Sequence, residues 1–510
     1  LGTNASGAVS SYGDVTLNFG DSTSYTSSFT NTYSDAGSIR LWARYELLNE
    51  SGVGTGNYIS GGSNNFVNVP AGFCIEPTET NWACSVPGLT ASCSAFKQAG
   101  DAFNLSVTAK QASGVSTDYC SHNTTANFSG VVNLSHSLVA PTAVSGGDAG
   151  TFSLTNTTLT SGTVNVSSRF SDMGTFTISA GGNGYLAETL PLNTSENIGR
   201  FYPAYFNVVS TVDAVYANGN TGFTYTGQLE ADGTTGSISY SSPPELIFDV
   251  RGADDQLLKN YLAPFYSLPV ATVTAGSSTT GALLPAQQLS VTASISNGVV
   301  SSPDSNNQYT YTFNTSDHFV FNRNANSLRS PFNNDIALTV TSFIEPVDFV
   351  DINSSTVISG SGGPIYYGRV RIENAYGPET EPVPQTFKTE YFDGTTFIFN
   401  TLDSGTSYDL SNVNTITVTD VGDSLNNLTN TDSSVSGTVS DTGLFSNGLL
   451  NVNWSVPLSN RYGSYNFLYT VDNWLKYDWN GSGDEDPSGV VNFGQYKGND
   501  RIIYWKEINH

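Results

Sequence analysis

Phe103-Asn-Leu-Ser-Val-Thr-Ala-Lys110 alternates strictly between apolar and polar side chains. Because successive side chains of a β-strand point to opposite faces, this pattern predicts a strand with one buried face. The same period recurs from Ile39 to Leu47, where Trp42 falls on the face opposite to Tyr45. Both segments are therefore predicted to be half-buried strands.

Further alternating runs follow at intervals of about 12 residues, at Phe152/Leu154, Val164/Val166 and Phe176/Ile178. Strands at this spacing, separated by Gly and Asn turns, are typical of β-sandwiches. The stretch most favourable for a short helix is 254–261. We predict an all-β fold of tandem immunoglobulin-like β-sandwich domains in an elongated array.

A chain of 510 residues is too long for one hydrophobic core. Breaks are expected where Gly, Ser and Asn concentrate, so the chain is divided into four β-sandwich domains at 1–68, 69–182, 183–352 and 353–510. We expect the first to be shortened on its N-terminal side and the second to hold the cysteines. The third carries a long loop insertion, and the fourth carries an acidic loop.

The charge balance narrows the possible partners. Only 12% of the residues are charged, and 44 acidic residues face 18 basic ones, a net charge of −26. A protein that follows a nucleic-acid backbone needs clustered Lys and Arg, so we expect no nucleic acid as partner. No apolar run approaches the ~20 residues of a membrane span, so we expect no membrane insertion in this segment.

All four cysteines, Cys74, Cys84, Cys93 and Cys120, lie close together in the sequence. An even, clustered set in a polar, β-rich chain predicts two disulfides in an oxidising compartment, hence an extracellular, cell-surface location. Three pairings are possible, of which we favour Cys84–Cys93 with Cys74–Cys120. Zinc is the alternative, but no C-x2-C pair is present.

The sequence contains no recognisable catalytic constellation. Its four histidines, His122, His136, His318 and His510, lie far apart, and neither H-E-x-x-H nor G-x-S-x-G occurs. We therefore expect a protein that is not an enzyme. The 44 carboxylates leave glycoside hydrolysis open as an alternative, because that reaction needs only two of them facing a cleft.

A candidate metal site lies near the C-terminus, in Asp478-Trp-Asn-Gly-Ser-Gly-Asp-Glu-Asp486. Oxygen-bearing side chains alternate along it as in the first half of a calcium loop, with Gly483 at the sixth position. The predicted Ca²⁺ ligands are Asp478, Asn480, Ser482, Asp484 and Asp486. Gly489 stands where an EF-hand has its bidentate Glu, so a full EF-hand is excluded; an acidic solvated turn is the alternative.

Aromatic residues crowd the same end of the chain, at Trp474, Tyr477, Trp479, Phe493, Tyr496, Tyr504 and Trp505. Packed sandwich cores use many aromatic side chains, which makes core packing the favoured interpretation. A platform on which sugars stack is the alternative.

Several segments together resemble one family, the MshQ-like C-terminal domain family of the mannose-sensitive haemagglutinin (MSHA) type IV pilus. They occur in order at 33–45 (YSDAGSIRLWARY), 70–74 (PAGFC), 92–104 (SCSAFKQAGDAFN), 199–203 (GRFYP), 367–377 (YGRVRIENAYG), 474–480 (WLKYDWN) and 493–507 (FGQYKGNDRIIYWKE). The resemblance implies an exported, pilus-associated or adhesin-like protein, and it supplies no catalytic residue. Gly405 is a departure, because the resemblance leads us to expect Cys there.

Three functional hypotheses follow. We prefer a non-catalytic structural and adhesive surface protein associated with an MSHA-like pilus, with pilus components or surface glycans as partners. The first alternative is a carbohydrate-binding module or glycoside hydrolase acting on surface polysaccharide. The second is a subunit of an extracellular filament or surface layer that self-associates through sheet edges.

Overall fold

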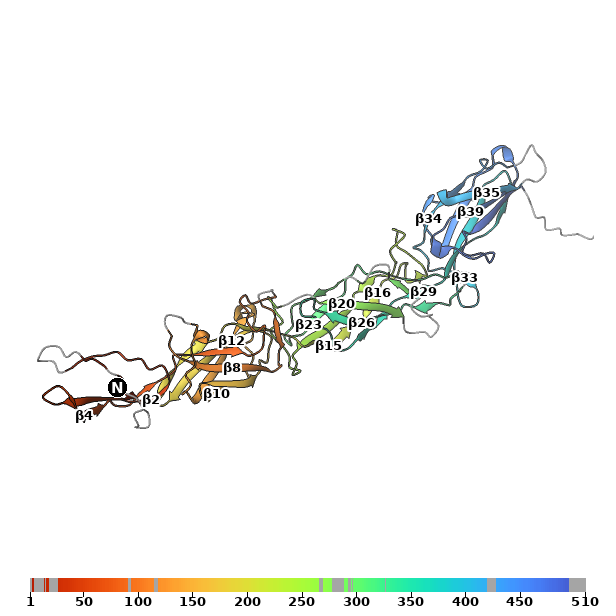
Figure 1. The fold of residues 1–510 in the computed structure, drawn as a ribbon. Helices are drawn as coiled ribbons and strands as arrows, with labels where there is room; N and C mark the ends of the chain where they lie inside the picture. Colours follow the sequence, from red (N-terminus) through yellow and green to blue (C-terminus); the bar gives the residue numbers. More distant parts are fainter. Residues whose placement is uncertain are drawn as a thin grey trace, which may run out of the picture.

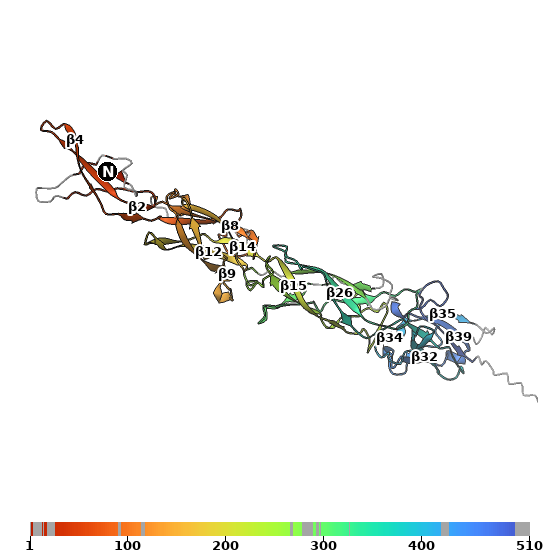
Figure 2. The same ribbon diagram turned by 90° about the horizontal axis from the view of Figure 1, so that it is seen from below.

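The computed structural model describes residues 2–3, 13, 15–17, 26–89, 93–113, 118–265, 269–277, 289–291, 295, 297–325, 327–419 and 428–494. Within these residues the regular structure consists of β-strands and short 3-10 turns, and no α-helix occurs. The strands form an elongated array that runs from the N-terminal hairpin to the C-terminal sandwich (Figures 1 and 2). The predicted all-β architecture is confirmed.

The N-terminal part of the chain is a three-stranded sheet in the order β1 (Gly2–Thr3), β3 (Leu41–Leu48), β4 (Gly54–Gly62), in which β3 and β4 form a hairpin. Tyr45 pairs with Ile59 across the hairpin, and these side chains are 63% and 62% exposed. A short ladder of β2 (Gly37–Ile39) and β5 (Phe66–Asn68) follows it toward the next domain. The alternation at 39–47 is divided between β2, which ends at Ile39, and β3. Ile39 is buried as predicted, whereas Tyr45 and Leu47 on the predicted buried face of β3 are exposed.

The second domain is a sandwich of two sheets. The smaller sheet has the order β11 (Thr163–Ser168), β8 (Phe103–Lys110), β6 (Gly72–Pro77). The larger has the order β10 (Asn156–Leu159), β9 (Gly130–Ala140), β12 (Gly174–Tyr185), β14 (Ile198–Tyr202), β7 (Ala95–Gln98), with β13 (Glu188–Thr194) on β12. Its strands thus continue beyond residue 182.

The core of the second sandwich follows from the alternation in β8. Phe103, Leu105, Val107 and Ala109 are all at most 1% exposed, while the intervening side chains face outward. The ring of Phe170 stacks on that of Phe176 at 4.3 Å between centroids. Burial of this apolar face stabilises the sandwich by about 25 cal/mol per Å² of surface removed from water.

The third sandwich spans Tyr205 to Ser361. Its strands are β15 (Tyr205–Val212), β16 (Ala214–Tyr216), β18 (Tyr240–Ser242), β19 (Glu245–Arg251), β20 (Val270–Ser277), β21 (Leu289–Val291), β22 (Val299–Val300), β23 (Tyr309–Thr312), β24 (Phe319–Phe321), β26 (Ile336–Ile344), β27 (Thr356–Ile358) and β28 (Gly360–Ser361). Sheet β15-β19-β23-β22 and sheet β20-β26-β27 contribute to one apolar core.

Residues 254–261 are not helical, so the helix expected there is wrong. Asp255 has a φ of 63°, which an α-helix does not allow. Asn260 is fully buried, and its side-chain amide contacts backbone groups of the second sandwich. The segment is a docking loop, and contacts between domains determine its shape.

The fourth sandwich pairs two sheets. Its strands are β30 (Gly368–Ile372), β31 (Ala375–Gly377), β32 (Val383–Phe392), β33 (Phe397–Phe399), β34 (Ser407–Asp409), β35 (Val413–Thr419), β36 (Val435–Gly437), β37 (Thr442–Leu444), β38 (Leu449–Trp454), β39 (Gly463–Tyr469) and β40 (Ser488–Phe493). A small sheet of β17 (Thr224–Tyr225), β29 (Pro364–Tyr366) and β25 (Phe332–Asn333) joins it to the third sandwich.

Candidate functional site

The four cysteines form two disulfides, Cys74–Cys120 and Cys84–Cys93, which is the favoured pairing. Glu76 lies near the first of these, and within the described part of the chain this trio is the only group of three His, Cys, Asp or Glu side chains close enough to share a metal. Because its two sulfurs are joined to each other, they are not free thiolates that could bind zinc.

The acidic loop predicted to bind calcium lies between β39 and β40 and is closed by a bridge between Tyr477 and Glu485. Asp478 accepts a hydrogen bond from the N–H of Gly481 at 2.6 Å. Asn480 and Ser482 both donate to Oε1 of Glu485, at 2.6 and 2.8 Å. Three of the five predicted ligands therefore hold the loop's own shape.

The other two predicted ligands face neighbouring segments. Asp484 pairs with Nε of Arg323 at 2.9 Å. Asp486 accepts from the N–H of Val471 at 3.1 Å and lies 3.4 Å from Nζ of Lys476. The five side chains are thus divided among different partners, and calcium binding stays a prediction.

Asp484 belongs instead to the junction between the third and fourth sandwiches, which Arg323 holds together. Besides that ion pair, Arg323 donates to the carbonyl oxygens of Gly368 and Trp474, each at 3.0 Å, and to that of Lys476. Its guanidinium lies 3.9 Å from the ring centroid of Tyr367. A planar, five-donor cation at 7% exposure is well suited to hold several acceptors at once.

A buried carboxylate reinforces the same junction. Asp403 is 0% exposed and accepts from the hydroxyl of Tyr225 at 2.8 Å and from the side-chain amide of Asn220 at 3.0 Å. Tyr225 and its neighbour Phe223 belong to the third sandwich by sequence but pack in the core of the fourth. The two domains are therefore interlocked rather than merely in contact.

Gly405, where the resemblance leads us to expect Cys, lies against this network. A Cβ built there would overlap the side-chain oxygen of Asn220. The glycine allows the loop after Asp403 to approach the inserted segment closely.

The junction between the second and third sandwiches also depends on a buried ion pair. Arg200 and Asp348 form a two-pronged salt bridge in which the side chains are 5% and 6% exposed. Nε of Arg200 also donates to the carbonyl of Cys93 at 3.0 Å, so the Cys84–Cys93 loop helps to orient the guanidinium. Such a pair is strongly destabilising to break, because one charge then stays buried alone.

A carboxylate and a docking loop complete this junction. Asp172 of the second sandwich accepts from the backbone N–H groups of Lys259 and Asn260, at 3.1 and 3.3 Å, and from that of Met173 at 2.8 Å. Burial raises the pKa of the Asp172 carboxyl to about 6, because desolvation outweighs these hydrogen bonds. Lys259 adds an exposed salt bridge to Asp148 at 2.9 Å.

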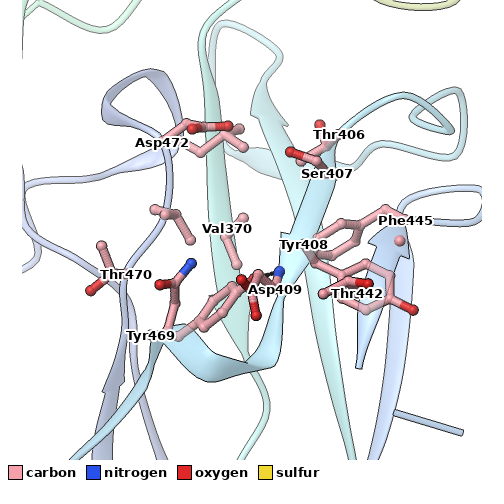
Figure 3. A pocket seen from close by; sticks show the side chains of 14 residues that line it. Val370, Thr406, Ser407, Tyr408, Asp409, Thr442, Phe445, Tyr469, Thr470 and Asp472 are labelled. Atoms are coloured by element: carbon pink, nitrogen blue, oxygen red, sulfur yellow. Dashed lines mark hydrogen bonds between the residues drawn. The ribbon is translucent and has the colours of Figure 1, made fainter. Parts of the chain in front are cut away.

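Beside the Arg323 junction lie two adjoining hollows of about 430 and 610 Å³. Both are bordered by Thr406, Ser407, Thr470, Val471 and Asp472. We call the pair the junction groove. In Figure 3 Val370 lies between Asp472 and Asp409, with Tyr408 and Phe445 along one side of the smaller hollow.

The C-terminal aromatic residues have different roles. Phe493 is buried in the fourth core, as favoured. Tyr477 and Trp479 surround the guanidinium of Arg369, which lies 4.9 and 4.7 Å from their ring centroids. Trp474 is half-buried and borders the larger hollow of the junction groove. Tyr496, Tyr504 and Trp505 lie outside the described residues.

Taken together, the described strands define an array of tandem β-sandwiches with buried polar junctions. The chain belongs to the DUF6701 family. Models of its second, third and fourth domains match residues 69–169, 172–363 and 366–508. The match of the third domain begins within the second sandwich, since β12 pairs with β9 and β14 pairs with β7.

Similarity to solved structures is loose. Chicken CNTN1 FN1-FN3 domains cover 83% of this chain and 98% of their own, with 6% identity and a TM-score of 0.22. A marsupial T cell receptor covers 78% and 95%, with 9% identity and a TM-score of 0.18. Four N-terminal Ig domains of Dscam1 cover 89% and 94%, with 10% identity and a TM-score of 0.14. No curated protein matches the chain.

The part of the chain that the structure describes contains no helix long and apolar enough to cross a membrane.

Proposed function

We propose that the chain is an exported, non-catalytic stalk of a bacterial cell surface, structural and adhesive in role, and associated with an MSHA-like type IV pilus. The observation that carries this proposal is the pair of interlocked junctions, in which Arg200–Asp348 and Arg323–Asp484 fix one sandwich against the next. A stalk must keep its length, and buried polar contacts restrict bending at each joint.

The compartment and the pilus association rest on different support. Two disulfides favour an oxidising environment, and a net charge of −26 favours contact with water rather than with anionic lipid. The pilus association rests on the family resemblance of the segments quoted above.

Electron microscopy of single molecules tests the stalk. We expect narrow distributions of the angles at both joints of the wild-type chain. Arg200→Ala should broaden only the joint between the second and third sandwiches, and Arg323→Ala only the next one. Arg371→Ala is the matched control, since its side chain is 55% exposed. A freely jointed wild-type chain would refute the proposal.

Calcium binding remains a separate proposal for the acidic loop. If the loop binds Ca²⁺, the melting temperature should rise on its addition, because a ligand that binds only the folded state stabilises it. Asp478→Ala should abolish the rise; the hydrogen bond that this carboxylate accepts comes from Gly481 within the loop itself. An unchanged melting temperature in the wild-type chain would exclude the site.

A further inference from the structure

We propose that the junction groove binds a short saccharide that is neutral or carries amino groups. The saccharide would be a ligand of the proposed stalk. This inference rests on the proposed function, because a protein at the cell surface is exposed to surface sugars. The groove's two hollows, about 430 and 610 Å³, are of the size that small-molecule sites have in proteins. Since they share five bordering residues, they can hold adjoining sugar rings.

Polar groups in the groove are free to receive a ligand. Asp472 precedes the 3-10 turn η6 (Asn473–Leu475), yet its carboxylate does not cap that turn. Within the described residues, Asp472, Asn473 and Glu230 have no side-chain hydrogen-bond partner. Carboxylate and amide groups that are not already paired are the acceptors and donors that sugar hydroxyls require.

A buried hydroxyl in the wall gives independent support. Ser237, 4% exposed, borders the larger hollow, and its Oγ has no hydrogen-bond partner in the described structure. A buried polar atom without a partner costs free energy, and such atoms in native proteins usually find a water or a ligand. One hydrogen-bonding group in the wall of the groove, the hydroxyl of Ser237, therefore has no partner within the described protein.

The apolar surfaces of the groove suit the C–H faces of sugar rings. Trp474 borders the larger hollow, and Tyr408 and Phe445 border the smaller one, with 6.1 Å between their ring centroids. Pockets for small ligands commonly combine aromatic walls with a few well-placed polar groups. Aromatic surface is thus present in both hollows.

The charge of the groove selects among sugars. Glu230, Asp409 and Asp472 border it, and the only cation among its described lining residues is Lys476, whose amine lies 3.4 Å from Asp486. Excess negative charge repels carboxylated or sulfated sugars and attracts an ammonium group. Neutral and amino sugars are therefore the expected class, and uronic acids are excluded.

Isothermal titration calorimetry of the full chain with mannotriose, glucosamine trisaccharide and galacturonate trisaccharide tests the proposal. We expect binding of at least one of the first two and none of the third. Asp472→Asn should weaken it at least tenfold. Ser407→Trp, which fills the groove from an exposed strand position, should abolish it. Glu188→Gln, on the exposed surface of the second sandwich, is the matched control.

Three results would overturn the inference: no binding of either neutral or amino sugar, equal binding of the galacturonate, or binding that survives both groove variants. New reducing ends after incubation would also overturn it, because they indicate a hydrolase. The joint angles seen by electron microscopy are independent of these results. If the chain has fixed joint angles but binds no sugar, the proposed saccharide site is wrong and the proposed stalk function is unaffected.

Discussion

Strands β3 and β8 have the same alternation of apolar and polar residues, but the apolar face of β8 is buried and that of β3 is exposed. Leu105 of β8 is 0% exposed beneath the second sheet of its sandwich, whereas Leu47 of β3 is 40% exposed on the hairpin. Alternation thus specifies a strand and its two faces. Burial of one face depends on a partner sheet, which β8 has and the described hairpin lacks.

The largest expected effect is at the covered strand. Leu105→Ala should lower the free energy of unfolding by about 4 kcal/mol, because it removes buried apolar contacts and leaves a cavity. Urea unfolding followed by circular dichroism measures the change. A loss below about 1 kcal/mol would show that the second sandwich repacks around the smaller side chain.

The next effect concerns the buried ion pair at the junction between the second and third sandwiches. Arg200→Ala should cost about 3 kcal/mol, since Asp348 would stay buried without its counter-ion. A double variant, Arg200→Met with Asp348→Leu, should recover most of the stability because neither charge is then buried. Failure of the double variant to recover would show that the Arg200 contact with Cys93 carries the stability instead.

The pH dependence of the stability of this junction is a smaller effect than the loss of its ion pair. With a pKa of about 6 in the folded chain and an ordinary value of 3.8, Asp172 holds its proton more tightly when folded. Its contribution to stability is therefore greatest below about pH 4 and falls by on the order of 2 kcal/mol as the pH rises to 6. Asp172→Asn should remove this slope from thermal melts between pH 4 and 7; identical slopes in variant and wild type would contradict it.

The smallest effect is at the uncovered strand. Leu47→Ala should change the free energy of unfolding by no more than about 0.5 kcal/mol, as is usual for exposed positions. It is the same substitution as Leu105→Ala, so the pair isolates burial as the cause. A cost near that of Leu105→Ala would mean that another surface covers the hairpin in solution.

Local signals predicted much of this fold. Alternation located β8, because it depends on neighbouring residues alone, and the even, clustered set of cysteines predicted the two disulfides, which span 9 and 46 residues. The calcium pattern at 478–486 is also local, yet Asp484 pairs with Arg323, which lies 161 residues away. Sequence spacing contains no information about such a partner.

The junctions and the groove could not be predicted from the sequence for the same reason. Arg200 and Asp348 are separated by 148 residues, and each looks like an ordinary surface charge in its own segment. A weak signal existed, because basic residues are scarce: an arginine within an apolar run such as GRFYP at 199–203 is a candidate for a buried pair. The larger hollow alone depends on three segments meeting, 219–237, 405–407 and 470–476, which no single stretch encodes.

The segment that carries Phe223 and Tyr225 limits how this protein can be taken apart. A chain cut between residues 363 and 366 would deprive the C-terminal sandwich of two fully packed aromatic rings and of the strand pairing between β17 and β29. Recombination or grafting would therefore have to move the last two sandwiches together. The number of units that can be exchanged independently is therefore smaller than the number of domains.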